Sequence, residues 1–284
     1  MAHFSTPLRY PGGKARLGMW LGELFDYNEF SNFTYVEPFA GGAGAAIYLL
    51  LKNKVNDIII NDADLAIYSF WYSMLNNTEH FINKIESTEI SIESWFKCKE
   101  IYSNPNKHDL LSLGFSTFFL NRTNRSGILK AGVIGGKEQS GRYKIDARFN
   151  KRNLINRIRT ISERKKSISV YNLDCVEFIG EIHKFVKKNP IFYFDPPYYS
   201  KGSQLYKNFY AHNDHIEVSN ILKNLDHPWL LTYDLCAPIT EMYEGINSER
   251  FNFHYSTHLN RPVASEVLFY KNILLKTPPY MTRK

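Results

Sequence analysis

The stretch Pro190-Ile-Phe-Tyr-Phe-Asp-Pro-Pro-Tyr198 decides how the rest of this chain is interpreted. Its β-branched and aromatic residues are typical of a buried strand, and the prolines end that strand because proline cannot donate to the ladder. We therefore expect a strand over 190–194 that fixes Asp195 at its carboxyl end. There the carboxylate, the Pro196 carbonyl and the Tyr198 ring could hold a flat ring by an exocyclic amine. A plain strand-to-loop turn with a solvated Asp195 is the alternative.

Further apolar runs predict strands on either side of this one. Helical patterns separate most of them, which favours a mainly parallel, doubly wound α/β sheet. The last two runs have no convincing helix between them, so we expect an antiparallel pair at the sheet edge. The expected strands are 33–37, 57–61, 168–171, 229–233, 251–255 and 266–275.

The segment between the second and third expected strands is too long for a single crossover helix. It is helical and aromatic-rich as far as Leu120, and then basic and glycine-rich with short β-like runs. We interpret 76–164 as an inserted lobe that ends in a glycine-rich hairpin, and 1–75 with 165–284 as the core.

The charge of the chain is uneven. In total, 35 Lys and Arg against 28 Asp and Glu give a net charge of +7. Residues 121–166 alone hold 14 Lys or Arg and 3 Asp or Glu, so the remainder is net acidic. An exposed surface that serves only solubility usually carries both positive and negative charges. The basic segment therefore predicts a polyanion partner, and nucleic acid is the one we expect.

Other features exclude several classes of protein. No apolar run approaches the roughly 20 residues that span a membrane, and no signal-type segment opens the chain, so we expect a cytoplasmic protein. The three cysteines are odd in number and far apart, which indicates neither a disulfide framework nor a zinc site. The pair His212-x-x-His215 comes nearest to metal-ligand spacing, and a solvated helix start explains it better. We expect no metal.

A glycine-rich turn, Phe39-Ala-Gly41-Gly42-Ala-Gly44, follows the first expected strand. Such a turn lets the backbone approach a ligand and opens a helix. A nicotinamide-binding fingerprint has the pattern Gly-x-Gly-x-x-Gly, but counting from Gly42 puts Ile47 at the position of the third glycine. The turn also lacks the Gly-Lys-Ser/Thr of a phosphate-binding loop. Asp62 ends the second strand, where a carboxylate can bind both ribose hydroxyls. Asp64 is a substitute, and a helix N-cap is the alternative role for either.

Taken together, several short motifs resemble the Dam-type adenine-N6 DNA methyltransferases of the D12 class, alpha group. In this family the cofactor motif precedes the catalytic one, and the resemblance covers most of the chain. The motifs are Tyr10-Pro-Gly-Gly-Lys14, Glu37-Pro-Phe-Ala-Gly41, Asn61-Asp62, Leu120-Asn-Arg122 through Gly127, Gly141-Arg-Tyr-Lys144 and Asp195-Pro-Pro-Tyr198.

The resemblance implies a Rossmann-like methyltransferase sheet, S-adenosylmethionine as methyl donor and a flipped adenine as acceptor. Asp195, Pro196 and Tyr198 would grip the adenine. The implied cofactor-binding residues are Tyr10 and Lys14 at the methionine end, Phe39 and Gly41 along the cofactor, Asp62 at the ribose, Asp174 near the adenine ring, and Asp195. Position 10 is Tyr where many members have Trp. The stretch from Thr123 to Ser126 differs from GATC-methylating members, so GATC is not implied.

The inserted lobe is the expected DNA-recognition lobe, with double-stranded DNA as partner. Asn121, Arg122 and Arg125 are candidates to read bases, because Arg pairs with guanine and Asn with adenine in the major groove. Arg122 could instead brace the hairpin. The expected phosphate contacts are Lys137, Lys144, Lys151 and Arg152. We expect a monomer, and a cognate restriction endonuclease is left open.

Competing interpretations remain at this point. The same grip serves adenine in RNA or N4 of cytosine in DNA. A DNA-binding protein with a dead methyltransferase fold predicts a lost acidic or glycine residue, whereas Gly41, Asp62 and Asp195 are present. A nicotinamide oxidoreductase would leave the basic segment unexplained.

Overall fold

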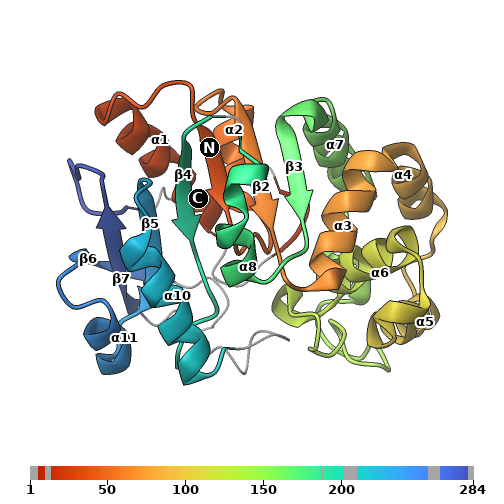
Figure 1. Ribbon diagram of the computed structural model, residues 1–284. Helices are drawn as coiled ribbons and strands as arrows, with labels where there is room; N and C mark the ends of the chain where they lie inside the picture. Colours follow the sequence, from red (N-terminus) through yellow and green to blue (C-terminus); the bar gives the residue numbers. More distant parts are fainter. Residues whose placement is uncertain (1–5, 10–13, 187, 201–209, 255–262, 281–284) are drawn as a thin grey trace. The chain divides into compact units, whose positions relative to one another are not determined.

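The computed structural model describes residues 6–9, 14–186, 188–200, 210–254 and 263–280. Within these ranges lies a seven-stranded sheet in the order β3-β2-β1-β4-β5-β7-β6 (Figure 1). The strands are β1 (Thr34–Glu37), β2 (Asp57–Asn61), β3 (Ile168–Tyr171), β4 (Pro190–Phe194), β5 (Trp229–Asp234), β6 (Asn247–His254) and β7 (Val263–Lys271).

The pairing confirms the expected mixed sheet. Strand β1 is parallel to both β2 and β4, β2 is parallel to β3, and β4 is parallel to β5. Strand β7 is antiparallel to β5 and β6, so the last two strands form the predicted antiparallel edge. Strand β6 begins at Asn247, earlier than expected, and β7 ends at Lys271 rather than at residue 275. Tyr255, the expected end of β6, lies outside the described residues.

Helices cover both faces of this sheet, which explains why β1 and β4 at its centre are buried at every position. Phe25 of α1 contacts Tyr35 of β1, with ring centroids 5.9 Å apart. On the opposite face, Phe178 and Leu222 pack in one hydrophobic cluster with Phe192. The helices of this part are α1 (Gly18–Tyr27), α2 (Gly44–Leu51), α8 (Cys175–Gly180), α10 (His212–Asn224) and α11 (Ala237–Met242).

Asn61 ties together the carboxyl ends of three neighbouring strands. Its side-chain nitrogen donates to the carbonyls of Pro38 (3.1 Å) and Leu173 (3.0 Å), and its side-chain oxygen accepts from the Leu173 amide (3.0 Å). The side chain is buried. These bonds fix the turns after β1 and β3 against the end of β2, at the edge where parallel sheets bind ligands.

The chain divides into two compact units. The first comprises Met1–Phe4, Gly12–Ala63 and Ser167–Lys284, and it holds the sheet. The second comprises Ser5–Pro11 and Asp64–Lys166. Its helices are α3 (Leu65–Asn76), α4 (Thr78–Ser87), α5 (Ile92–Ser103), α6 (Leu110–Thr123) and α7 (Lys151–Ser162).

The second unit starts before the residue 76 at which we expected the lobe to begin, because α3 packs closely on α6. A Cβ placed on Gly114 of α6 would lie only 2.4 Å from the carbonyl oxygen of Ser69 in α3. Helix α6 is buried from Leu113 to Asn121. It is therefore the central helix of this unit.

The glycine-rich segment after α6 folds back on itself as a short hairpin. Between Asn124 and Arg148, all of which is described, the expected β-like runs reduce to one antiparallel bridge between Asn124 and Val133. Asn124 fixes this turn. Its side chain accepts from the Trp95 indole (2.7 Å) and donates to the Ile128 and Leu129 carbonyls.

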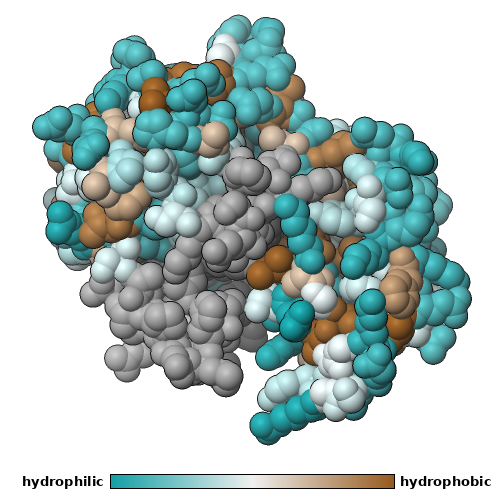
Figure 2. All heavy atoms as spheres, turned by 90° about the horizontal axis from the view of Figure 1, so that it is seen from below, coloured by the Kyte–Doolittle hydropathy of each residue, from teal (hydrophilic) through white to brown (hydrophobic). Residues whose placement is uncertain are grey.

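The coloured surface in Figure 2 is mainly hydrophilic, and hydrophobic residues appear there as smaller patches. Large exposed hydrophobic side chains are few and include Met19, Tyr27, Phe96 and Leu274. Within the described ranges, no helix combines the length and the apolar character that a membrane crossing requires.

Candidate active site

Asp195 directly follows β4, as predicted, and side chains of two other elements contact its carboxylate. The Thr232 hydroxyl on β5 donates to Asp195 Oδ1 at 3.0 Å. The Lys14 ammonium, on the short 3₁₀ helix η1 (Lys14–Arg16), lies 3.4 Å from the same oxygen. The carboxylate nevertheless keeps 24% of its side chain exposed, so a ligand can reach it. It stands at the switch point between β1 and β4, where the strand order reverses.

Lys14 belongs to a buried polar network with two further side chains. Its ammonium lies 2.9 Å from Glu266 Oε2 on β7 and donates to the Tyr198 hydroxyl at 2.8 Å. That hydroxyl in turn donates to Glu266 Oε1 at 2.5 Å. Only 3% of the Lys14 side chain and 1% of the Glu266 side chain are exposed. A buried charge is tolerated only when it is paired, and this network supplies the pairing.

Burial and the charged groups of this network both shift the pKa of Asp195. Burial raises the pKa of Asp195 to about 6, the Lys14 ammonium lowers it, and the Glu266 carboxylate raises it. The Thr232 hydrogen bond also lowers this pKa. A carboxyl group whose pKa is shifted by burial and by specific charged neighbours is typical of a functional site.

The cofactor side is built from the turn after β1 and the end of β2. The backbone amide of Gly41 donates to Asp62 Oδ2 at 2.8 Å. Gly41 has φ +45°, and Ala43, the N-cap of α2, is also left-handed with φ 43°. A carboxylate at a strand end beside a glycine turn can accept hydrogen bonds from both hydroxyls of a nucleoside ribose, so the residues present fit S-adenosylmethionine.

Glu37, at the end of β1, anchors the helix that follows the turn. Its Oε1 accepts from the Tyr35 hydroxyl and from the Ala46 amide, both at 3.0 Å. The residue is buried. Burial raises the pKa of Glu37 to about 8, and these two hydrogen bonds only partly oppose that effect.

Asp174 and Asp64 both act as N-caps of helices. Asp174 is exposed and caps α8, accepting from the Val176 amide at 2.8 Å. Asp64 caps α3 in the same way, through the Ala66 amide. Its N-cap role, left open from the sequence, is therefore observed. Tyr10 lies outside the described residues.

Tyr210 is a candidate that the sequence did not single out. Its ring lies 5.7 Å from the ring of Phe39, edge to face. Burial raises its pKa, and the charges of Asp174 and Asp62 contribute to the rise. Tyr210 therefore lies among the predicted cofactor residues. Tyr210 lies in none of the motifs quoted from the sequence, so the sequence did not point to it.

His212 begins α10 as expected, but His215 does not match a solvated helix start. His215 is buried, and its Nδ1 lies 2.7 Å from the Tyr233 hydroxyl. Its ring also contacts those of Tyr199 and Tyr210. The prediction of a solvated helix start was wrong for His215, because this residue lies on the buried face of α10 with Val218 and Leu222.

Two of the expected base-reading residues are engaged inside the second unit. Asn121 is buried, accepts from the Arg9 amide, and donates to the carbonyls of Arg9 and Gly127. Arg122 donates through Nε to the Arg148 carbonyl at 2.8 Å. Burial, together with neighbouring arginines, lowers the pKa of Arg122 to about 9. These contacts fit a brace, the alternative left open for Arg122, and they also occupy Asn121.

The other hairpin candidates lie on the surface. Arg125 is exposed beside Gly132. Lys137 is exposed, with its ammonium 5.7 Å from the Phe96 ring centre. Lys144 is exposed and donates to the Gln139 carbonyl at 2.5 Å. Arg125 is therefore the one of the three proposed base readers whose side chain faces solvent.

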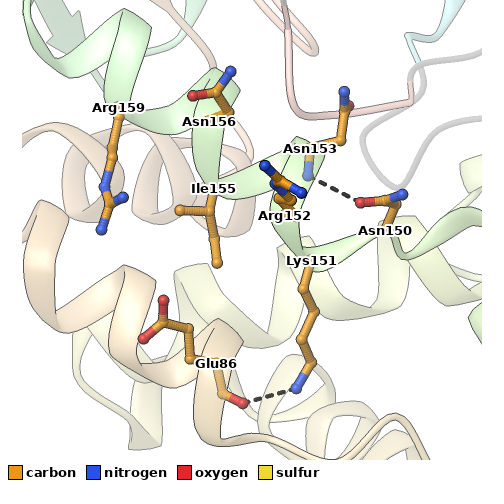
Figure 3. Close-up of a pocket in the computed structure, with 8 residues that line it drawn as sticks. All are labelled: Glu86, Asn150, Lys151, Arg152, Asn153, Ile155, Asn156 and Arg159. Atoms are coloured by element: carbon orange, nitrogen blue, oxygen red, sulfur yellow. Dashed lines mark hydrogen bonds between the residues drawn. The ribbon is translucent and has the colours of Figure 1, made fainter.

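Lys151 and Arg152 open α7 beside a shallow pocket (Figure 3). The Lys151 ammonium donates to the carbonyls of Glu86 and Thr88, both at 2.8 Å, so it caps the carboxyl end of α4. Arg152 is exposed. Arg159, one further residue that lines the pocket, is also exposed.

The three cysteines are free in the structure. Over the described ranges, His, Cys, Asp and Glu side chains nowhere gather in a group of three that could hold a metal ion.

Comparisons with known proteins give a family match and similar methyltransferases. The model of the family described as D12 class N6 adenine-specific DNA methyltransferase matches residues 10–260. The chain is 25% identical over 237 residues to the type II methyltransferase M.MjaIII of Methanocaldococcus jannaschii, covering 77% of this chain and 79% of that protein. It is 23% identical over 262 residues to the type II methyltransferase M.CviBI of Paramecium bursaria Chlorella virus NC1A, covering 87% and 92%.

Among solved structures, the chain is similar to the rRNA methyltransferase aviRa from Streptomyces viridochromogenes. The identity is 13% and the TM-score 0.43, over 92% of this chain and 86% of that one.

Proposed function

Because this chain belongs to the family of D12 class N6 adenine-specific DNA methyltransferases, we propose that it transfers a methyl group from S-adenosylmethionine to N6 of an adenine flipped out of duplex DNA. One observation carries the finer part of this proposal. The acceptor carboxylate of Asp195 and the glycine turn at Gly41 follow β4 and β1, which pair directly. Donor and acceptor sites would then adjoin at the switch point.

On the donor side, Asp62 would accept hydrogen bonds from the ribose, while Phe39 and Gly41 would line the cofactor. When bound, the sulfonium donor supplies an activated methyl group and leaves as a neutral thioether. Positioning should therefore provide much of the rate acceleration. Asn61 supports this positioning, because it holds the turns around Asp62 together.

On the acceptor side, Asp195 and the Pro196 carbonyl would accept the two hydrogens of the adenine amine. These bonds draw the nitrogen toward tetrahedral geometry and make its lone pair available to the methyl carbon. The methylated nitrogen must then lose one proton. Asp195 Oδ can take it, because the pKa of this carboxyl is raised to about 6.

A base inside duplex DNA must leave the stack before it can reach such a site, at a cost of a few kcal/mol. Stacking on Tyr198 would offset part of this cost, by roughly 1–3 kcal/mol. The Tyr198 hydroxyl is bonded to Lys14 and Glu266, which fixes the ring in place.

The second unit would bind the duplex, with Arg125 as base reader and Lys137, Lys144 and Arg152 as phosphate contacts. Both curated relatives carry the name type II methyltransferase. We accordingly propose that a restriction endonuclease of the same specificity accompanies this enzyme in the cytoplasm, and that the enzyme acts as a monomer.

Modification-sensitive sequencing of DNA from cells that express the protein tests the proposed reaction. We expect N6-methyladenine at one short recurring sequence. Methylation of cytosine N4, or of RNA alone, would contradict the proposed acceptor. In a single-turnover assay on the identified site, Asp195→Ala should reduce transfer below detection while the protein stays folded. Near-normal transfer by this variant would remove Asp195 from the mechanism.

A further inference from the structure

We propose that Glu266 is a positioning residue for methyl transfer. It holds the ammonium of Lys14 and the hydroxyl of Tyr198, so that the Asp195 carboxylate and the Tyr198 ring keep the geometry that grips the target amine. This inference rests on the proposed function and adds to it a residue that lies in none of the recognised motifs.

The hydrogen bonds of Glu266 are divided between the two partners. One carboxylate oxygen, Oε2, lies 2.9 Å from Lys14 Nζ, and the other, Oε1, accepts from the Tyr198 hydroxyl at 2.5 Å. Lys14 Nζ closes the triangle with a 2.8 Å bond to the same hydroxyl. Each of the three side chains is therefore held by two others. Loss of one would loosen both of the remaining two.

The sheet explains why Glu266 reaches this point. Strand β7 is antiparallel to β5, with Glu266 opposite Asp234 and Leu268 opposite Thr232. Side chains at alternate positions share a face of a sheet, so Glu266 lies on the same face as Thr232, which binds Asp195. Two neighbouring strands thus support the acceptor carboxylate from one face.

Electrostatics gives this arrangement a measurable signature. Two charged groups act on the pKa of Asp195: Lys14 on η1 and Glu266 on β7. Asp195 in turn raises the pKa values of three neighbours, Tyr193 on β4 and Tyr35 and Glu37 on β1. Lys14 lowers the pKa of Asp195 and Glu266 raises it. Removal of either charge should therefore move the pH dependence of the reaction, in opposite directions.

Single-turnover methyl transfer on duplex DNA, measured across pH, tests the proposal with three variants and one control. Glu266→Gln should slow transfer roughly 10- to 100-fold, as expected for a displaced reacting group. In the pH–rate profile of Glu266→Gln, the acid limb should move to lower pH because the pKa of Asp195 falls. Lys14→Gln should move that limb to higher pH because the pKa of Asp195 rises. Tyr198→Phe keeps the ring and loses the hydroxyl, so it should slow transfer without shifting the limb as far. Glu244→Gln, an exposed glutamate of the same unit, should match the wild type.

Three results would overturn the proposal. They are a wild-type rate in Glu266→Gln, an acid limb that moves the same way in the Glu266 and Lys14 variants, and a wild-type rate in Tyr198→Phe. The last one applies even if Glu266→Gln fails to fold. Failure of the proposed function itself looks different, because the wild-type protein would then not methylate duplex adenine at all.

Discussion

Glu37 is a buried carboxyl group that should make the stability of the fold depend on pH. Its pKa is raised to about 8 by burial, so the native state binds a proton that the unfolded chain releases near its ordinary value of 4.5. The stabilisation is complete below that ordinary value and is lost as pH rises through about 8. The free energy of unfolding should then fall by up to about 1.4 kcal/mol per pH unit in this range.

Glu37→Gln keeps an acceptor for Tyr35 and Ala46 and cannot ionise. Denaturant unfolding between pH 6.5 and 8 should give a flatter profile for this variant than for the wild type. A slope that persists in the variant would mean that another group titrates there.

Asp62 is the residue that we propose binds the ribose of the cofactor. Asp62→Ala should weaken S-adenosylmethionine binding far more than DNA binding, because charge-assisted hydrogen bonds to the ribose are lost, each roughly 1.5–3 kcal/mol. The variant also loses the bond from the Gly41 amide, so the turn itself should loosen. Calorimetric titration of the donor measures the effect. An unchanged affinity would place the ribose contact elsewhere.

At the scale of elements, α7 is fastened to α4 by Lys151. We expected this lysine at a DNA phosphate, but its ammonium binds two carbonyls at the carboxyl end of α4, of which Figure 3 shows the one of Glu86. A positive charge there also complements the helix dipole. Lys151→Met should therefore lower the free energy of unfolding by about 1–3 kcal/mol and leave the salt dependence of DNA binding nearly unchanged. Denaturant unfolding and binding titrations test both parts. Unaltered stability with a smaller salt slope would restore the phosphate role.

The elements also show which parts of the site were predictable. Asp195 and Asp62 could be found because prolines, glycines and apolar runs mark the ends of their strands locally. Glu266 could not, because it sits inside an apolar strand and its partner Lys14 is 252 positions away. Asn121 was proposed as a base reader because Asn can pair with adenine, and its burial could not be foreseen because it depends on Arg9, which is 112 positions away. Long-range pairing leaves no local pattern in the sequence.

At the scale of the whole molecule, charge is segregated by unit, since the basic segment 121–166 belongs entirely to the second. DNA affinity should then depend steeply on salt through exposed cations of that unit alone. Arg152→Gln should lower the slope of log affinity against log salt by roughly one. Lys52→Gln, an exposed cation of the first unit, is the matched control. Equal effects of the two changes would contradict the segregation.

The strand order has a consequence for the timing of synthesis. Strand β7 follows β6 along the chain, yet it lies between β5 and β6 in the sheet and carries Glu266. While the chain is still growing on the ribosome, β6 has no neighbour in the sheet and Lys14 has no Glu266 to bind. Domains made at about 5–20 residues per second begin to fold as they emerge. A nascent chain would thus lack the Lys14–Glu266 contact of the proposed site until β7 had left the ribosome.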